Sequence, residues 1–154
     1  NIRHHIRIDA SGKILSGFHI LRALALGADL CNSARAMMMA LGCIQALECN
    51  KNSCPTGVAT QDPTLMKGLV IEDKKHRVAN FHKHTMEGFV ELMASAGIDH
   101  PSGLNRHQIS RRVFMNKVAT LEEIYPSIPV GSMLGSEMPE RYKMSYASAS
   151  AEKF

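Results

Sequence analysis

The chain contains no tryptophan, and aromatic residues make up only 5% of its 154 residues. Proteins that bind single-stranded nucleic acid usually combine aromatic side chains that stack on bases with a clustered basic stripe. Here the net charge is +4, and the basic residues are scattered apart from short groups at 3–7, 74–77 and 106–112. A mildly basic charge without a stacking surface argues against nucleic-acid binding.

Long apolar runs are also missing. The longest apolar stretches, such as residues 34–44 with the interruptions Arg35 and Gly42, fall short of the roughly 20 residues that cross a membrane. The start at residues 1–5 is polar and basic, and nothing behind it resembles a secretory signal peptide. We therefore expect a cytoplasmic protein with reduced thiols. Because the first residue is Asn rather than Met, we expect a fragment or a processed product.

What is present is a folded composition with alternating strand and helix patterns. Hydrophobic residues make up 45% of the chain and charged residues 21%, as in globular proteins. Residues 6–10 alternate apolar and polar side chains as in a strand, and 29–33 form a second short strand. Each is followed by a helical pattern, at 17–28 and at 34–46. Strand, helix, strand and helix with short connections imply parallel strands joined by right-handed crossovers.

Two strands do not make a stable parallel sheet by themselves. We therefore predict an α/β fold in which these segments are the C-terminal βα units of a (β/α)8 TIM barrel, a fold of about 250 residues. A cysteine-rich loop at 48–64 and a long helix from about Asp73 to Ala96 follow. The apolar stripe predicted to be buried on this helix includes Val78, Phe81, Phe89 and Leu92.

The last part of the sequence carries weaker signals. Residues 108–114 and 121–124 are short pieces without a clear period. From residue 126 onward Pro, Gly and Ser become frequent, and the end of the chain is of low complexity. We assign residues 1–125 to the C-terminal part of the barrel domain and predict an irregular, flexible tail over 126–154.

The two turns from strand to helix are candidates for binding an anion. They comprise Ser11, Gly12 and Lys13 after the first strand and Ser33, Ala34 and Arg35 after the second. Backbone N–H groups at a helix start attract anions, and glycine lets a phosphate approach the backbone closely. In β/α barrels the loops after the last two strands often form a phosphate site. The same residues also fit two ordinary turns in which the serines act as local helix caps.

Three of the four cysteines lie close together in the sequence, at Cys43, Cys49 and Cys54, with Pro55 following. Zinc sites usually have four ligands in Cys-x2-Cys pairs, so this spacing fits zinc poorly. Thiolates also hold iron–sulfur clusters, where a proline can follow a ligand, and three ligands suit a three-iron cluster. The alternative is three buried thiols, because cysteine packs as a small hydrophobic residue. Spacing alone leaves both open, and Cys31 is expected to be a buried strand thiol.

Residues 40–61 resemble the iron–sulfur signature of glutamate synthases. That signature has Gly-Cys, a six-residue step to Cys-His or Cys-Asn, and then Cys-Pro-x-Gly-Val-Ala-Thr-Gln, and every cysteine of this chain falls in register with it. Upstream, residues 11–17 resemble the family's glycine-rich FMN phosphate loop, and residues 27–36 resemble its second phosphate turn. The resemblance covers roughly residues 4–125.

This resemblance implies a β/α barrel that holds FMN and a 3Fe-4S cluster. It implies reduction of 2-iminoglutarate, formed from 2-oxoglutarate and ammonia, to L-glutamate. The implied cluster ligands are Cys43, Cys49 and Cys54, and the implied FMN-phosphate residues are Ser11, Gly12, Lys13, Ser33, Ala34 and Arg35. Lys13 stands where the large enzymes usually have a second glycine, which is more similar to the short stand-alone FMN-binding relatives.

The implied partners are 2-oxoglutarate, ammonia that is free or derived from glutamine, and an electron donor such as ferredoxin or a reductase subunit. The residues that bind 2-oxoglutarate are expected on earlier barrel strands, so this chain alone should not catalyse the full reaction. Two alternatives stay open: an FMN and iron–sulfur oxidoreductase of the same fold with another substrate, or a non-catalytic iron–sulfur electron carrier. A carrier would need the cysteines but not the phosphate turns.

Overall fold

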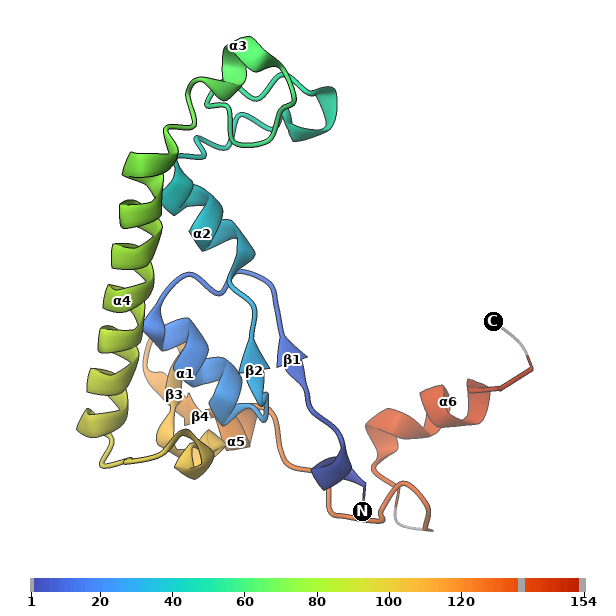
Figure 1. The fold of residues 1–154 in the computed structure, drawn as a ribbon. Helices are drawn as coiled ribbons and strands as arrows, with labels where there is room; N and C mark the ends of the chain where they lie inside the picture. The colour runs from blue at the N-terminus through green and yellow to red at the C-terminus, as the bar shows by residue number, and fades with distance from the viewer. Residues whose placement is uncertain (1, 136–137, 153–154) are drawn as a thin grey trace.

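The protein is seen in a computed structural model that describes residues 2–135 and 138–152. Its strands and helices are, in chain order, β1 (Asp9–Ala10), α1 (Gly17–Ala25), β2 (Leu30–Cys31), α2 (Ala34–Leu41), α3 (Pro63–Met66), α4 (Ile71–Ser95), β3 (Ser110–Phe114), β4 (Lys117–Thr120), α5 (Leu121–Ile124) and α6 (Glu140–Ser148). Short 3-10 turns lie at 3–5, 49–51, 101–103 and 106–108. Helix α4 runs along one side, beside both α1 and α2, and the cysteine loop lies at its N-terminal end (Figure 1).

The predicted parallel strands are present. β1 and β2 pair in parallel, with Asp9 opposite Leu30 and Ala10 opposite Cys31, and α1 forms the connection between them. Within residues 2–135 and 138–152 the strands form this pair and a separate antiparallel pair, and they do not close a barrel. The chain is therefore mixed α/β, and its place in a larger barrel stays a prediction.

The second helix is shorter than the sequence predicts. The expected helix over 34–46 ends at Leu41, because Gly42 adopts a left-handed conformation with φ of +110°. Gln45 and Leu47 also have positive φ values, which a continuing helix does not allow. The chain therefore leaves α2 immediately before Cys43 and enters the cysteine loop.

The core lies between α1, the C-terminal half of α4 and the segment that follows α4. Its buried members are Leu21, Ala25, Phe89, Met93, Ile98, Ile109 and Leu121. Glycine allows the two helices to approach closely: a Cβ added at Gly17 would lie 2.5 Å from the backbone nitrogen of Phe89. A side chain at position 17 would therefore separate α1 from α4.

Helix α4 begins two residues earlier than predicted, and Phe89 is the one member of the predicted stripe that is fully buried. Val78 and Phe81 are half-buried. Phe89 is 4% exposed, but Leu92 is 37% exposed, and Met93 is buried in its place. The reason is geometric, because residues 85, 89 and 93 form one row with four-residue spacing that faces α1. Within residues 2–135 and 138–152, no helix combines the length and the hydropathy needed to cross a membrane.

The segment after α4 contains a hairpin that the sequence did not predict. β3 and β4 pair antiparallel, with Ser110 opposite Thr120 and a shift of register between Arg112 and Phe114. β3 is exposed at every position except the half-buried Val113. Because both faces of β3 meet solvent, the alternation of apolar and polar residues that marks a half-buried strand is missing.

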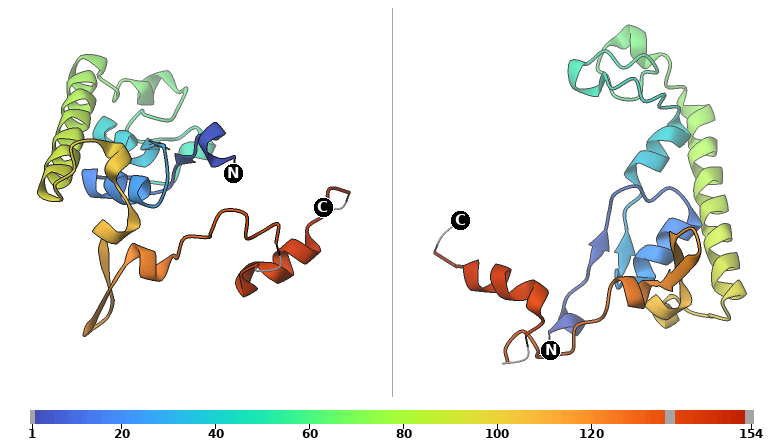
Figure 2. Two further views of the ribbon diagram at one scale, coloured as in Figure 1. Left: turned by 90° about the horizontal axis from the view of Figure 1, so that it is seen from below. Right: turned by 180° about the vertical axis from the view of Figure 1, so that it is seen from behind.

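The tail is not irregular throughout. Residues 140–148 form α6, which stands apart from the helices of the core in all three views of Figures 1 and 2. Apart from the half-buried Tyr142, α6 is exposed along its length, so no apolar stripe marked it in the sequence. Residues 136–137 and 153–154 of the predicted tail, and residue 1 of the predicted domain, lie outside the described residues. The domain division stays a prediction.

The substitution Phe89→Ala should lower the free energy of unfolding by about 3–5 kcal/mol, because it leaves a cavity in the contact between α1 and α4. Chemical denaturation followed by circular dichroism measures this change. Val90→Ala is the matched control, since Val90 is the exposed neighbour on the same helix and should change the stability by no more than about 0.5 kcal/mol. Equal effects of the two substitutions would contradict the packing described here.

Candidate functional site

The turns after β1 and β2 lie side by side, as the sequence predicts. The N–H of Asn32 donates to the carbonyl of Ala10 at 2.8 Å, which extends the parallel pairing into the second turn. The hydroxyl of Ser33 then donates to the carbonyl of Ile14 at 2.7 Å. These two bonds join the turns, so groups from both can face one ligand.

The serines do not act as the caps that the ordinary-turn interpretation requires. Ser33 precedes α2 but uses its hydroxyl on Ile14 instead of capping the helix. The residue that precedes α1 is Ser16, so Ser11 lies well before that helix. The first turn is therefore a loop ahead of α1 rather than a helix start. Of the two helices, only α2 begins directly at one of these turns, so its N-terminal N–H groups are the ones that could face a ligand there.

The first turn is left-handed at two consecutive residues. Gly12 has φ of +93° and Lys13 has φ of +57°, a conformation that costs a residue with a Cβ about 1–2 kcal/mol. Apart from Gly12 itself and its two chain neighbours, no atom of the described residues lies within 4 Å of the place where a Cβ of Gly12 would stand. Space beside the backbone is therefore open for a ligand.

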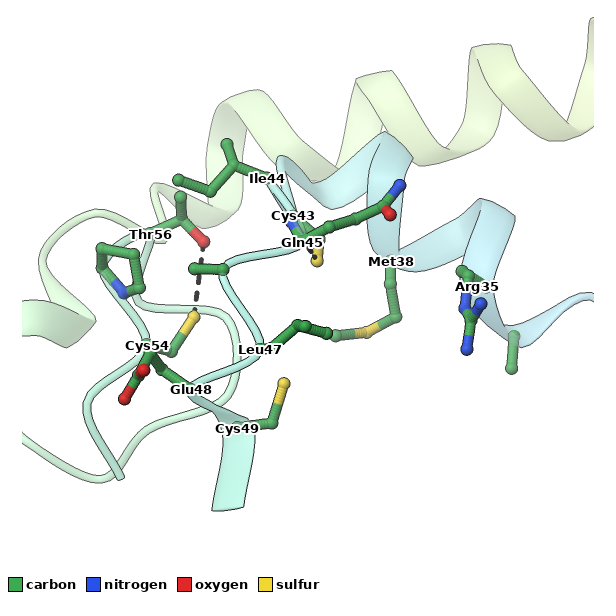
Figure 3. Close-up of a pocket in the computed structure, with 13 residues that line it drawn as sticks. Arg35, Met38, Cys43, Ile44, Gln45, Leu47, Glu48, Cys49, Cys54 and Thr56 are labelled. Atoms are coloured by element: carbon green, nitrogen blue, oxygen red, sulfur yellow. Dashed lines mark hydrogen bonds between the residues drawn. The ribbon is translucent and has the colours of Figure 1, made fainter. Parts of the chain in front are cut away.

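All three signature cysteines line one pocket of about 360 Å³ next to α2 (Figure 3). Cys43 is half-buried, Cys49 is exposed and Cys54 is buried. Ala34 and Arg35 of the second turn line the same pocket. The start of α2 therefore belongs both to the second turn and to the cysteine pocket, whereas Ser11, Gly12, Lys13 and Ser33 lie outside the residues that line this pocket.

The cysteine loop is held closed by its own polar contacts. The side-chain oxygen of Asn52 accepts the backbone N–H of Gln61 at 2.6 Å, and Asp62 caps α3 by accepting the N–H of Thr64 at 2.7 Å. Gly57 has φ of +73°, and a Cβ there would lie 2.2 Å from the carbonyl oxygen of Leu65. The Gly in the signature is therefore needed for both the conformation and the close contact with α3.

The surroundings of Cys54 favour its thiolate. The Thr56 hydroxyl lies 3.4 Å from the sulfur, and backbone N–H groups of Ala59, Thr56 and Val58 also point at it. Together, and against a smaller opposing effect of burial, they lower the pKa of Cys54 from 9.0 to about 7. Metal ligation requires a thiolate, so the loop prepares this cysteine as a ligand.

Cys31 has the opposite character. It lies half-buried on β2, outside the residues that line the cysteine pocket. Burial, with a smaller contribution from the charge of Asp9, raises the pKa of its thiol. The predicted position on a strand is confirmed, but the thiol is half-buried rather than buried.

The three sulfurs surround the pocket rather than meeting at a single ion-sized point (Figure 3). Over residues 2–135 and 138–152, no three His, Cys, Asp or Glu side chains are arranged to hold one metal ion. An iron–sulfur cluster contains several metal atoms and is wider than one ion, so thiols spread around a pocket suit it better. The ligand roles of Cys43, Cys49 and Cys54 stay predictions.

The sequence did not indicate that three further residues, Thr56, Lys74 and Arg77, lie beside the signature cysteines. Thr56 is the variable residue of the signature, and its hydroxyl becomes relevant only when the loop turns back on Cys54. Lys74 and Arg77 come from α4, yet they share a cleft with Cys43. No spacing along the chain indicates that contact.

Comparison with known proteins identifies the family. The sequence pattern described as "Conserved region in glutamate synthase" matches residues 1–99, and the chain belongs to the glutamate synthase family. It is 48% identical over 111 residues to the "Glutamate synthase large subunit-like protein YerD" of Bacillus subtilis, covering 72% of the chain and 21% of that protein. It is 41% identical over 98 residues to the "Archaeal glutamate synthase" (NADPH) of Methanocaldococcus jannaschii, covering 64% of the chain and 19% of that protein.

A more distant match covers more of the chain. Over 145 residues it is 26% identical to the "Glutamate synthase" (NADH) of Saccharomyces cerevisiae, covering 92% of the chain but 7% of that protein. The chain therefore spans at most about a fifth of the length of these curated relatives.

The substitution Thr56→Val should raise the pKa of Cys54 from about 7 toward the ordinary value of 9.0, because the hydroxyl is the largest of the contributions that stabilise the thiolate. Titration of the thiolate ultraviolet absorbance in metal-free protein measures it, with Cys54→Ser subtracted as the blank. Ser53→Ala is the control, since that hydroxyl donates to Glu48 and should leave the titration in place. An unchanged midpoint in Thr56→Val would contradict this account of Cys54.

Proposed function

We propose that this chain is the part of a glutamate synthase that holds the phosphate of FMN and a 3Fe-4S cluster. The reaction is the reduction of 2-iminoglutarate, formed from 2-oxoglutarate and ammonia, to L-glutamate. The observation that carries the proposal is the common pocket of Ala34, Arg35 and the three signature cysteines. This shared pocket supports the proposal, because an enzyme that passes electrons between two cofactors needs their binding residues close together. Membership of the family supports the reaction class.

The residues of the two turns fit an anionic phosphate. Gly12 leaves open space beside its backbone, and the start of α2 offers N–H groups that the Ser33 hydroxyl does not occupy. Lys13 and Arg35 are exposed cations on the two turns. In this proposal Ser11, Ala34 and their neighbours act through the backbone, and the two cations add attraction to a group with up to about two negative charges.

The thiols fit a cluster for a chemical reason as well as a spatial one. Ligands must be deprotonated to bind metal, and the loop already favours the thiolate of Cys54. Cys43 and Cys49 approach the same pocket from either end of the segment that joins α2 to the 3-10 turn. When bound, the cluster would exchange single electrons and FMN would transfer a hydride. The chain's own residues bind these groups and set their electrostatic surroundings.

The rest of the activity would depend on residues outside this sequence. We assign no catalytic residue here, and 2-oxoglutarate would be bound by earlier strands of the barrel. Ammonia would be free or derived from glutamine, and the electrons would come from ferredoxin or a reductase subunit. A cytoplasmic location agrees with reduced thiols and stays a prediction.

A second candidate is an oxidoreductase with the same cofactors and a different substrate. Lys13 favours it, because a strained non-glycine residue at φ of +57° stands where the large enzymes usually have glycine. A non-catalytic electron carrier is less well supported, since it would not need two adjoining turns with open backbone. Flavin absorption that persists through purification would argue against such a carrier.

The substitution Cys49→Ser in the full-length protein should remove the cluster while leaving the fold largely intact, because the exposed Cys49 contributes little to the core. Iron and sulfide analysis, together with visible absorbance, measures the loss. Cys31→Ser is the control and should retain the cluster, since Cys31 lies outside the pocket. A Cys49→Ser protein that keeps its full iron content would require another set of ligands.

The substitution Gly12→Val in the full-length protein should weaken FMN binding by at least tenfold (about 1.4 kcal/mol), because a side chain would fill the space left for the phosphate. Fluorescence titration with FMN gives the dissociation constant, and thermal unfolding without FMN monitors the fold. Gly97→Val is the matched control: Gly97 also has a positive φ and open space around it, but it follows α4 and lies outside both turns. The same FMN affinity in both variants would place the flavin elsewhere.

A further inference from the structure

Two cations from α4 reach the end of α2 just before the first signature cysteine. A Cβ added at Gly42 would lie 3.5 Å from Nζ of Lys74 and 4.0 Å from Nη1 of Arg77. Both side chains line a cleft together with Gly42 and Cys43. Figure 1 shows why they meet: the N-terminal end of α4 lies against the C-terminal end of α2.

Lys74 is the better shielded of the two. Its side chain is only 17% exposed, and its ion-pair partner Asp73 lies at 3.4 Å on the exposed surface of the same helix. Among the residues that line this cleft, Lys74 and Arg77 are the charged ones. In the cysteine loop, Glu48 pairs with Lys51 at 3.1 Å and Asp62 caps α3, while Arg35 lies at the far side of the pocket. Positive charge therefore predominates in the cleft beside Cys43.

Negative charge at the sulfur of Cys43 has fewer stabilising neighbours in its own loop than negative charge at Cys54 has. Cys43 follows the C-terminal end of α2, where the helix dipole is negative, and its own N–H is used by the carbonyl of Met38 at 3.0 Å. Its sulfur accepts a bond from the N–H of Gln45 at 3.4 Å, whereas several N–H groups and a hydroxyl surround Cys54. The field of a helix end would oppose added negative charge at Cys43 unless nearby cations offset it.

We propose that Lys74, assisted by Arg77, raises the reduction potential of the cluster held by Cys43, Cys49 and Cys54. This inference rests on the proposed function. Reduction adds one electron to the cluster and breaks no bond, so the reduced form carries one more negative charge. A nearby positive charge stabilises that form, and a shielded charge is screened little by salt. In this proposal Lys74 acts through its positive charge beside the cluster and does not bind the iron.

The test is a redox titration of the full-length holoprotein with dithionite, in which the electron paramagnetic resonance of the oxidised cluster gives the midpoint potential. Lys74→Met should shift the reduction equilibrium about tenfold toward the oxidised form, a fall of about 59 mV for one electron. Lys74→Arg keeps the charge and should stay close to the parent. Melting temperatures are recorded in parallel, because a purely structural role would change them without moving the potential.

Lys83→Met is the matched control on the same helix. Lys83 is 70% exposed, pairs with Glu87 and lies roughly 13 Å further along α4, so its removal should leave the potential in place. A parent potential retained in Lys74→Met would overturn the inference, as would equal falls in Lys74→Met and Lys83→Met.

Failure of the inference and failure of the proposed function give different results. If the parent protein carries no cluster signal, the proposed function fails and the inference falls with it. If Lys74→Met loses the cluster while Lys74→Arg keeps it, Arg77→Met is titrated, because its charge occupies the same cleft. A fall in its potential supports the inference, and a parent value overturns it.

Discussion

The close approach of α1 to α4 is the constraint on which the rest of the structure depends. Gly17 brings the start of α1 against the backbone of α4 at Phe89, and the buried residues of both helices pack around this contact. Because α4 is a single helix of 25 residues, about 37 Å long, fixing its C-terminal half also fixes its N-terminal half. That end is the one that meets α2 and the cysteine loop, so the position of the pocket follows from a contact far from it.

Local sequence patterns predicted part of this architecture. Two short strands, each followed by a helix, were enough to predict the parallel pair and the adjacency of their turns, because both follow from chain direction. The end of α2 was missed, since residues after Gly42 such as Ala46 favour helix while the backbone there requires positive φ. Leu92 and Met93 are adjacent apolar residues, and only the direction of the packing decides which of them is buried. The β3–β4 hairpin left no alternation because its surface is largely exposed.

The candidate site also has a part that the sequence predicted and a part that only the fold reveals. The cysteines and the turns could be named from a signature, which records residue types at fixed spacing. The hydroxyl of Thr56 at the sulfur of Cys54 depends on how the loop closes. The contact of Lys74 with the end of α2 depends on the packing of two helices. Interactions of this kind set the pKa of a thiol and the electrostatic field beside it, and no single stretch of sequence contains them.

The loop bonds of Asn52 and Asp62 have a consequence for access to the cysteine pocket. These bonds are internal to residues 52–64, and the apolar core is built from other segments. Opening the loop therefore leaves the contact between α1 and α4 intact, and such local openings cost less free energy than global unfolding. Amide hydrogens of the loop should exchange with solvent earlier than those of Phe89 and Met93. The proposed cluster could therefore be inserted after folding, while the loop opens locally and the core stays packed.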